Sequence, residues 1–349
     1  MRVRQEGWSP FEVNIHSLRC SDLAKRKISV LELGTVLNER YRLDHKIVST
    51  GFSDIYRGTK LTTNQTVAIK VLRLGEIPKN DRKEMQERFR REISAYSKLA
   101  HPNLVRLVDT GVYENALVYL VLEYISGETL AIRLWRDGAL GPFLAKHLMM
   151  QCLDALSAAH GQGIVHRDFK PHNIMVTGTG GQPNAVVLDL GLAGATDDWL
   201  SMAGDRITQP NHVPGSVAYM APEQIKGEVT PASDIYAWGL VYLECLTGSP
   251  VFTGSSNYEI VMKHMNETVQ IPEPLASHPL GQILRRATAK STSVRYRLAT
   301  EALSDLRRCG MSELNTARMT SKGIARPDKG HTTTRIDKEV LTKLARDSE

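Results

Sequence analysis

The chain has 349 residues, enough for two core-bearing lobes with short tails, and its hydrophobic (42%) and charged (23%) fractions are ordinary for a globular protein. The formal charge of +6 comes from scattered lysines and arginines without interleaved aromatic residues, which disfavours a nucleic-acid-binding surface. The longest apolar run, Ala116 to Leu122, is too short to span a bilayer, and the first residues carry no apolar signal core.

Four cysteines, Cys20, Cys152, Cys245 and Cys309, lie far apart, and no C-x-x-C pair suggests a zinc or redox site. Cys152 and Cys245 fall inside apolar helical patterns, so we expect buried free thiols. This cysteine usage, together with the first residues, indicates a reducing, cytoplasmic setting.

Regular structure is expected to begin near Tyr41, because residues 1–40 show no clear hydrophobic period. Turn residues separate three predicted strands, Tyr41 to Val48, Ser53 to Lys60 and Thr66 to Val71. The third contains Lys70, which is flanked by alanine and isoleucine in a run typical of a core strand. Taken alone, a lysine in a strand is more often a solvated edge residue.

An amphipathic helix is predicted from Asp81 to Leu99, before the break at Pro102. Glu92 lies in this helix among many charged residues, and by itself it is one more solvated charge. Two further strands are expected at Leu104 to Tyr113 and Ala116 to Glu123.

The rest of the chain is predicted to be mainly helical, with a short strand at Ile174 to Val176 and a buried strand at Ala185 to Leu188. A polar, mostly disordered tail is expected from Gly310 to Glu349. The predicted helices cover Pro142 to His160, Pro231 to Thr247, Tyr258 to Met265, Leu280 to Ala289 and Ala299 to Cys309.

The candidate chemistry lies in His166 to Val176, His-Arg-Asp-Phe-Lys-Pro-His-Asn-Ile-Met-Val. Asp168 can accept the proton of a substrate hydroxyl, and Lys170 can neutralise charge on a transferred phosphoryl group. Asn173 can ligate a metal ion. Phosphoryl transfer needs such a set, whereas the bland alternative is a polar turn between a helix and a strand.

This stretch resembles the catalytic loop His-Arg-Asp-x-Lys-x-x-Asn of the eukaryotic-type (Hanks-type) serine/threonine protein kinases. Asp189-Leu190-Gly191 is similar to the family's Asp-Phe-Gly, and Gly215 to Glu223 is similar to its Gly-Thr-x-x-Tyr-x-Ala-Pro-Glu. The Ala-Pro-Glu-Gln ending is more typical of bacterial members. The resemblance covers about Tyr41 to Cys309.

The resemblance implies an α+β fold of two lobes, the first a small antiparallel sheet with one long helix and the second mainly helical. The expected domains are an extension (1–40), a kinase domain (N-lobe 41–123, C-lobe 124–309) and the tail (310–349). ATP and Mg²⁺ are the implied cofactors, and proteins with serine or threonine are the implied substrates. No nucleic-acid partner or membrane span is expected, and the oligomeric state stays open.

The resemblance also assigns roles to individual residues. The catalytic and metal-binding residues would be Asp168, Lys170, Lys70 with its partner Glu92, and the metal ligands Asn173 and Asp189. The nucleotide would contact Ile47, Val48, Gly51, Ser53, Ile55, Ala68, Lys70, Leu122, Glu123, Ile125 and Met175. Structural roles fall to Arg167, to Asp234 as anchor of the catalytic-loop backbone, and to Arg295 as partner of Glu223.

The phosphate-covering loop departs from the family pattern, because Val48, Thr50 and Ser53 occupy the three glycine places and Gly51 occupies a variable one. Glycines there let backbone amides approach the phosphates, so we predict weak ATP affinity. The departure also supports an alternative, a pseudokinase scaffold with weak nucleotide binding. A small-molecule kinase of related fold is disfavoured by the presence of the segment Ser216 to Glu223 and of the helices predicted after it.

The activation segment is expected between Gly191 and Glu223, with Ser216 near the catalytic loop. Thr208 is the first candidate phosphorylation site and Ser201 the second. A phosphate on Thr208 would bridge Arg167 and Arg88. The alternative is that aspartates of the segment supply the negative charge and keep it always ordered.

Overall fold

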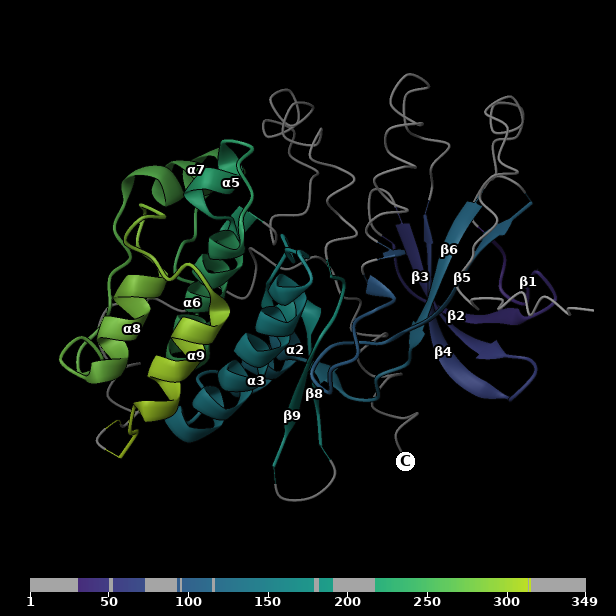
Figure 1. Ribbon diagram of the computed structural model, residues 1–349, viewed down its shortest axis with the longest axis horizontal. Helices are drawn as coiled ribbons and strands as arrows, with labels where there is room; N and C mark the ends of the chain where they lie inside the picture. The colour runs from purple at the N-terminus through teal and green to yellow at the C-terminus, as the bar shows by residue number, and fades with distance from the viewer. Residues whose placement is uncertain are drawn as a thin grey trace, which may run out of the picture. The chain divides into compact units, whose positions relative to one another are not determined.

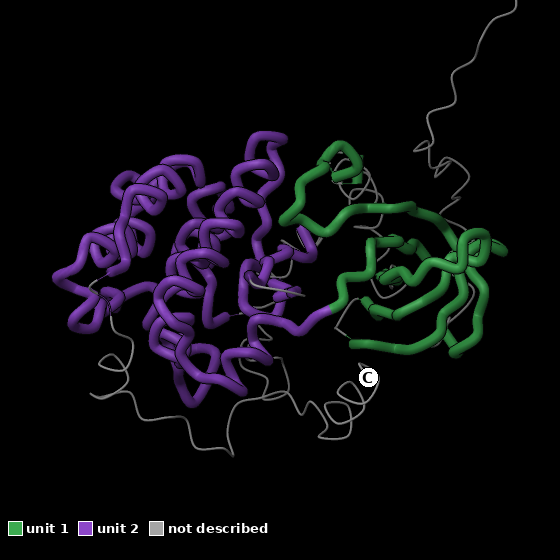
Figure 2. The backbone as a smooth tube through the Cα atoms, turned by 90° about the horizontal axis from the view of Figure 1, so that it is seen from below, with its two compact units in different colours: residues 1–126 green, residues 127–349 purple. Residues whose placement is uncertain are grey.

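The computed structural model divides into two compact units, residues 1–126 and 127–349, which Figure 2 colours separately. Within the part of the chain that the structure describes, no helix is both long and apolar enough to cross a membrane. The described residues are 31–49, 53–72, 93–94, 96–114, 117–178, 182–190, 217–312 and 314.

The first unit is built on a six-stranded antiparallel sheet with the strand order β1-β2-β3-β4-β6-β5 (Figure 1). One face of the sheet is covered by a core that includes Tyr41, Tyr56, Ile69 and Val121. The strands are β1 (Val36–Leu37), β2 (Tyr41–Ser49), β3 (Ser53–Lys60), β4 (Gln65–Leu72), β5 (Leu107–Tyr113) and β6 (Leu117–Glu123).

Four of these strands lie within one residue of their predicted ends, but β5 begins three residues later than predicted. The cause is a turn in which the amide of Leu104 donates to the carbonyl of His101 at 3.1 Å. Most of the predicted helix from Asp81 to Leu99 lies outside the described residues. Its described apolar side chains, Ile93 and Tyr96 among them, are buried.

The second unit is mainly helical and is centred on α6 (Pro231–Thr247), whose bounds confirm the prediction. Nearly every α6 residue is buried, as expected of a helix that is apolar all round. α3 (Pro142–Gly161) packs against α6 and against α9 (Ala299–Arg308), and the three helices lie side by side in Figure 1. The others are α2 (Leu130–Asp137), α5 (Pro222–Ile225), α7 (Asn257–Asn266) and α8 (Pro279–Ala287).

A small antiparallel sheet completes the second unit, with the order β7 (Glu128–Thr129), β8 (Ile174–Thr177) and β9 (Asn184–Val187). β9 packs against α3. A first unit based on a sheet and a second based on helices confirm the predicted α+β class. Burial continues past Cys309, because Met311 and Leu314 are also buried.

Cys152 in α3 and Cys245 in α6 are free and fully buried, and Cys309 is free and buried as well. Burial raises the pKa of the Cys152 and Cys245 thiols well above the ordinary range. The expectation of buried free thiols is therefore confirmed for these two residues, whereas Cys20 lies outside the described residues.

Candidate active site

In the catalytic-loop stretch, the side chains of Lys170 and Asn173 both contact the carboxylate of Asp168. Lys170 Nζ lies 2.9 Å from Asp168 Oδ1 and 2.7 Å from Oδ2. Asn173 Nδ2 donates to the main-chain oxygen of Asp168 at 2.8 Å and to Oδ2 at 3.0 Å. The Asp168 side chain stays 31% exposed, so it is held in place and still reachable from solvent.

His166 connects this loop to the strand that leads to Asp189. Its ring is fully buried; Nε2 lies 2.8 Å from the carbonyl of Leu188, and Nδ1 accepts from the amide of Asp168 at 3.3 Å. These contacts assign the ring proton to Nε2. Sequence reasoning gave His166 no role of its own, although its place at the head of the motif was the available signal.

Asn173 and Asp189 form the candidate metal site. The amide of Leu188 donates to the carbonyl of Asn173 at 2.8 Å, which places the residue before Asp189 against the loop. Since Asn173 Nδ2 is directed at Asp168, its Oδ1 is the atom left to bind a cation. In the described ranges no three His, Cys, Asp or Glu side chains could hold a metal together. Two oxygen donors suit Mg²⁺, which commonly takes its other ligands from substrate phosphates and water.

A buried carboxylate on α6 fixes the backbone of the loop. Asp234 accepts from the amides of His166 (2.7 Å) and Arg167 (2.8 Å), and its Oδ2 lies 2.8 Å from His160 Nε2. Burial acts to raise the pKa of Asp234, but the hydrogen bonds from His160 and from the loop outweigh it and hold the pKa below its ordinary value. Both carboxylate oxygens of Asp234 are therefore hydrogen-bonded, in agreement with its predicted role as anchor of the catalytic-loop backbone.

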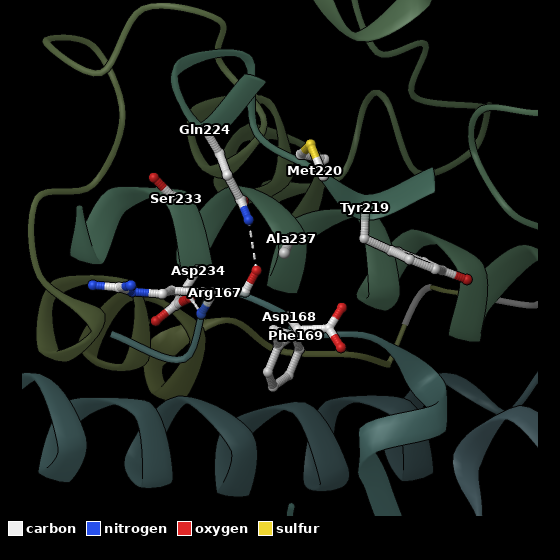
Figure 3. Close-up of a pocket in the computed structure, with 9 residues that line it drawn as sticks. All are labelled: Arg167, Asp168, Phe169, Tyr219, Met220, Gln224, Ser233, Asp234 and Ala237. Atoms are coloured by element: carbon white, nitrogen blue, oxygen red, sulfur yellow. Dashed lines mark hydrogen bonds between the residues drawn. The ribbon is translucent and has the colours of Figure 1, made fainter. Parts of the chain in front are cut away.

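Arg167 adopts φ 68°, a left-handed conformation that is strained for a non-glycine residue. Its amide is held by Asp234, and its carbonyl accepts from Gln224 Nε2 at 2.6 Å (Figure 3). Figure 3 also shows Asp168, Tyr219 and Met220 beside this contact, lining a small pocket. Gln224 was not predicted as a site residue, because its contact joins positions 57 apart in the chain.

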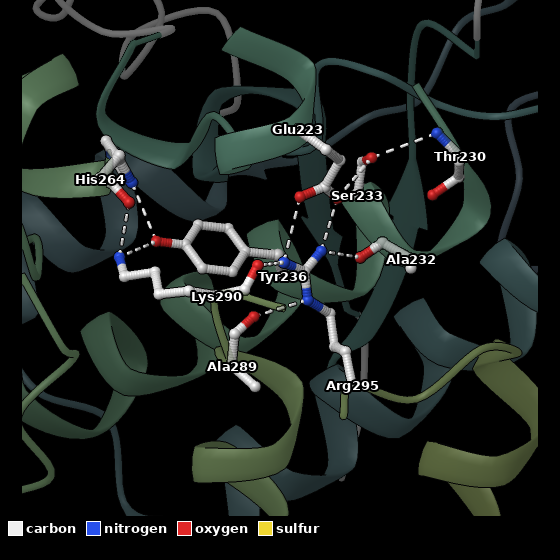
Figure 4. A network of polar contacts seen from close by, with 9 residues as sticks. All are labelled: Glu223, Thr230, Ala232, Ser233, Tyr236, His264, Ala289, Lys290 and Arg295. Atoms are coloured by element: carbon white, nitrogen blue, oxygen red, sulfur yellow. Dashed lines mark hydrogen bonds and ion pairs between the residues drawn. The ribbon is translucent and has the colours of Figure 1, made fainter. Parts of the chain in front are cut away.

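Glu223 and Arg295 form the predicted ion pair, at 2.6 and 3.1 Å (Figure 4). Arg295 is almost completely buried and also donates to the carbonyls of Ala232, Ala289 and Lys290. Ser233 Oγ donates to Glu223 at 2.8 Å. The end of the Gly215 to Glu223 segment is thus fastened to the start of α6 by a buried pair whose polar atoms are partnered.

Tyr219, from the same segment, fastens it to α6 a second time. Its hydroxyl donates to Glu244 Oε2 at 2.6 Å. Burial raises the pKa of Glu244 to about 7, and the hydrogen bond from Tyr219 opposes part of that rise. Glu244 is therefore a buried carboxyl that changes charge near neutral pH, which the sequence alone did not indicate.

In the first unit, the strand register gathers the candidate nucleotide residues on one face of the sheet. Val48 is directly opposite Ile55, which is opposite Lys70, and Ala68 is opposite Leu122. Directly opposite residues share a face, and residues two apart in a strand share it too. This face is the one opposite the core formed by Tyr56 and its neighbours.

The other predicted nucleotide residues are distributed as follows. Ile47 is half-exposed on β2, Ser53 is buried at the start of β3, and Glu123 and Ile125 are half-buried at the end of β6 and beyond it. Met175 is half-buried on β8 between Thr129 and Val186. The predicted site and regulatory residues that lie outside the described part of the chain are Thr50, Gly51, Arg88, Glu92, Ser201, Thr208 and Ser216.

Residues 41–326 match the family described as "Protein kinase domain". The chain is 37% identical over 279 residues to serine/threonine-protein kinase PrkC of Bacillus subtilis, covering 79% of this chain and 41% of that protein. It is 36% identical over 280 residues to serine/threonine-protein kinase PknB of Mycobacterium tuberculosis (77% and 43%). It is 34% identical over 293 residues to a probable PknB of Corynebacterium glutamicum (81% and 44%). The chain spans less than half the length of these curated relatives.

Proposed function

The chain belongs to the protein kinase domain family, and on that premise we propose that it is an ATP-dependent serine/threonine protein kinase. The observation that carries the proposal is the convergence of Lys170 and Asn173 on the Asp168 carboxylate. A polar turn with no chemical role would not need an ammonium and an amide aimed at the same half-exposed carboxylate. The relatives are named as serine/threonine-protein kinases, which supports serine and threonine as the acceptors.

In the proposed reaction, Asp168 orients the hydroxyl of a serine or threonine and accepts its proton. The hydroxyl oxygen then bonds to the γ-phosphorus of ATP as the bond to the ADP oxygen breaks. Lys170, beside Asp168, stabilises charge on the transferred phosphoryl group. Lys70, on the candidate nucleotide face, would contact the α- and β-phosphates, and its predicted ion pair with Glu92 remains part of the proposal.

Members of this family use ATP and, typically, Mg²⁺. Bound through Asn173 and Asp189, the ion would neutralise negative charge on the phosphates. The buried free thiols of Cys152 and Cys245 support a reducing location, and we propose the cytoplasm. We also propose that the kinase domain covers residues 41–309, with its N-lobe at 41–123 and its C-lobe at 124–309. Proteins with serine or threonine are its proposed substrates.

The pseudokinase alternative depends on the glycine-poor loop, and the relatives, which are named as kinases, give it no support. One assay separates the two readings. The purified protein is incubated with Mg²⁺, γ-labelled ATP and a general protein acceptor, and the labelled residues are identified. We expect label on serine and threonine, together with autophosphorylation.

Asp168→Asn is the test variant, and Asp137→Asn, which removes an exposed carboxylate on α2, is the matched control. Loss of one preorganised charged contact typically slows the reaction by about a hundredfold or more. We expect that loss in Asp168→Asn and none in Asp137→Asn. Equal transfer by Asp168→Asn and the unmodified protein would refute the assignment of Asp168. A folded, ATP-binding protein that transfers no phosphate would instead be a scaffold.

A further inference from the structure

Three side chains join the two strands that flank residues 50–52. Ser49 ends β2 and is directly opposite Asp54 of β3. Ser49 Oγ donates to Asp54 Oδ1, and Lys46 Nζ lies 2.9 Å from the same oxygen. Asp54 is only 3% exposed. One buried carboxylate oxygen therefore holds a hydroxyl and an ammonium from the opposing strand.

This cluster of Lys46, Ser49 and Asp54 lies on the core face of the sheet. Lys46 is opposite Tyr56, and its ammonium lies 5.7 Å from the centre of that ring. Asp54 precedes Ile55, which belongs to the other face together with Lys70. Because the cluster and the candidate nucleotide residues are on opposite faces, the cluster can hold the strand ends without occupying space that a nucleotide would need.

Electrostatics make the cluster resistant to separation of the strands. A buried carboxylate is costly when it loses its partners. Ser49 and Lys46 both belong to β2, so moving β2 away from β3 would remove these two partners of Asp54 together. The ends of the two strands are thereby kept at a fixed separation, although no glycine occupies the family's glycine places in this chain.

We propose that the cluster of Lys46, Ser49 and Asp54 positions the strand ends at Ser49 and Ser53 for the phosphates of ATP. Asp54 is then a positioning residue for phosphoryl transfer, and this inference rests on the proposed function. Its contribution is preorganisation, since contacts within the hairpin, and not the phosphates themselves, would set the position of these strand ends. The adenine and ribose would not depend on it.

The same hairpin supplies a matched control. Asp44 of β2 accepts from Thr59 Oγ1 at 2.6 Å and pairs with Arg42 Nε at 2.6 Å. Like the Asp54 cluster it joins a carboxylate, a hydroxyl and a cationic side chain, although here the cation is a guanidinium and the carboxylate is 28% exposed. Its β3 partner Thr59 is next to the last residue of that strand, at the opposite end from Ser53. Asp54→Ala and Asp44→Ala each remove one carboxylate from one hairpin.

The measurement is the affinity of the unmodified protein and each variant for Mg-ATP and for adenosine, by calorimetry. A contribution to preorganisation equal to about one hydrogen bond to a charged group corresponds to about tenfold in affinity. We expect Asp54→Ala to weaken Mg-ATP by about tenfold and to leave adenosine unchanged, while Asp44→Ala changes neither. Asp54→Asn, which keeps an acceptor for Ser49, should fall between Asp54→Ala and the unmodified protein.

Equal Mg-ATP affinity in Asp54→Ala and the unmodified protein would overturn the inference. So would an equal loss for Mg-ATP and adenosine, because that result indicates a distorted sheet. If Asp54→Ala does not fold, Ser49→Ala removes one exposed hydroxyl and should weaken Mg-ATP by about fivefold; unchanged affinity there counts against the cluster. An unmodified protein that binds Mg-ATP but transfers no phosphate refutes the proposed function alone.

Discussion

Replacing Asp234 is expected to damage stability and catalysis together. In Asp234→Asn the amide oxygen can still accept from the Arg167 amide, but the NH₂ group takes the place of Oδ2, which faces the amide of His166 and Nε2 of His160. His160 can adapt by moving its proton to Nδ1, a buried atom with no hydrogen-bond partner among the described residues. The His166 amide cannot adapt and is left facing a donor.

One charge-assisted hydrogen bond is lost and one buried donor is unsatisfied, which together cost about 3–5 kcal/mol. At roughly 2–4 °C per kcal/mol for a unit of this size, the melting temperature should fall by about 10 °C. Release of the His166 amide would also allow the strained φ of the adjacent Arg167 to relax, and that change would displace Asp168. A displacement of about 1 Å can cost a hundredfold in kcat.

Calorimetry gives the melting temperature, and steady-state phosphate transfer gives kcat. Gln224→Ala is the graded comparison, because it removes a neutral hydrogen bond to the carbonyl of the same Arg167. It should cost only about 1 kcal/mol. The reasoning is refuted if Asp234→Asn melts within about 2 °C of the unmodified protein, or if Gln224→Ala is the more damaging change.

Three further predictions concern ATP, regulation and pH. Restoring glycine at Thr50 and Ser53 should tighten ATP binding, measured by calorimetry; unchanged affinity would mean that these side chains do not hinder the loop. After phosphatase treatment, preincubation with ATP should activate the unmodified protein on an external substrate but not Thr208→Ala or Arg88→Ala; full activation of Thr208→Ala would exclude it as the switch. Burial raises the pKa of Glu244 from 4.5 to about 7, so this carboxyl binds its proton more tightly in the folded protein. The resulting stabilisation is fully present below pH 4.5 and is lost as the pH rises to about 7, with a slope of up to about 1.4 kcal/mol per pH unit. Glu244→Gln should therefore gain in melting temperature relative to the unmodified protein across that range, and parallel curves would contradict this.

The sequence was most informative where strong local signals coincide. α6 has Pro231 at its first position and Gly248, at φ 77°, after its end, so both bounds were predictable. The trio around Asp168 was equally accessible, because its members lie at fixed offsets in one short loop. By contrast, α2 was missed because it has only 8 residues, so that its buried Leu130 and Leu134 amount to a single i, i+4 repeat.

Contacts between distant residues were predictable only where the family resemblance supplied them, as for Glu223 and Arg295. Asp234 and His160 are 74 positions apart, and no local pattern in either helix indicates that they meet. The cluster at Asp54 depends on the register of β2, which shifts between Lys46 and Val48. A register shift changes which side chains share a face, and the alternation of residues alone does not locate it.

Because Cys152 and Cys245 are buried at the centre of the second unit, the rate at which they are alkylated reports how readily that unit opens. A thiol is alkylated through its thiolate, and both raised pKa and burial keep Cys152 and Cys245 in the unreactive form. Alkylation at these positions must wait until α3 and α6 separate from their neighbours. In a background that carries both Cys20→Ser and Cys309→Ser, the labelling rate would read out the free energy of that opening under native conditions, as amide hydrogen exchange does for backbone groups.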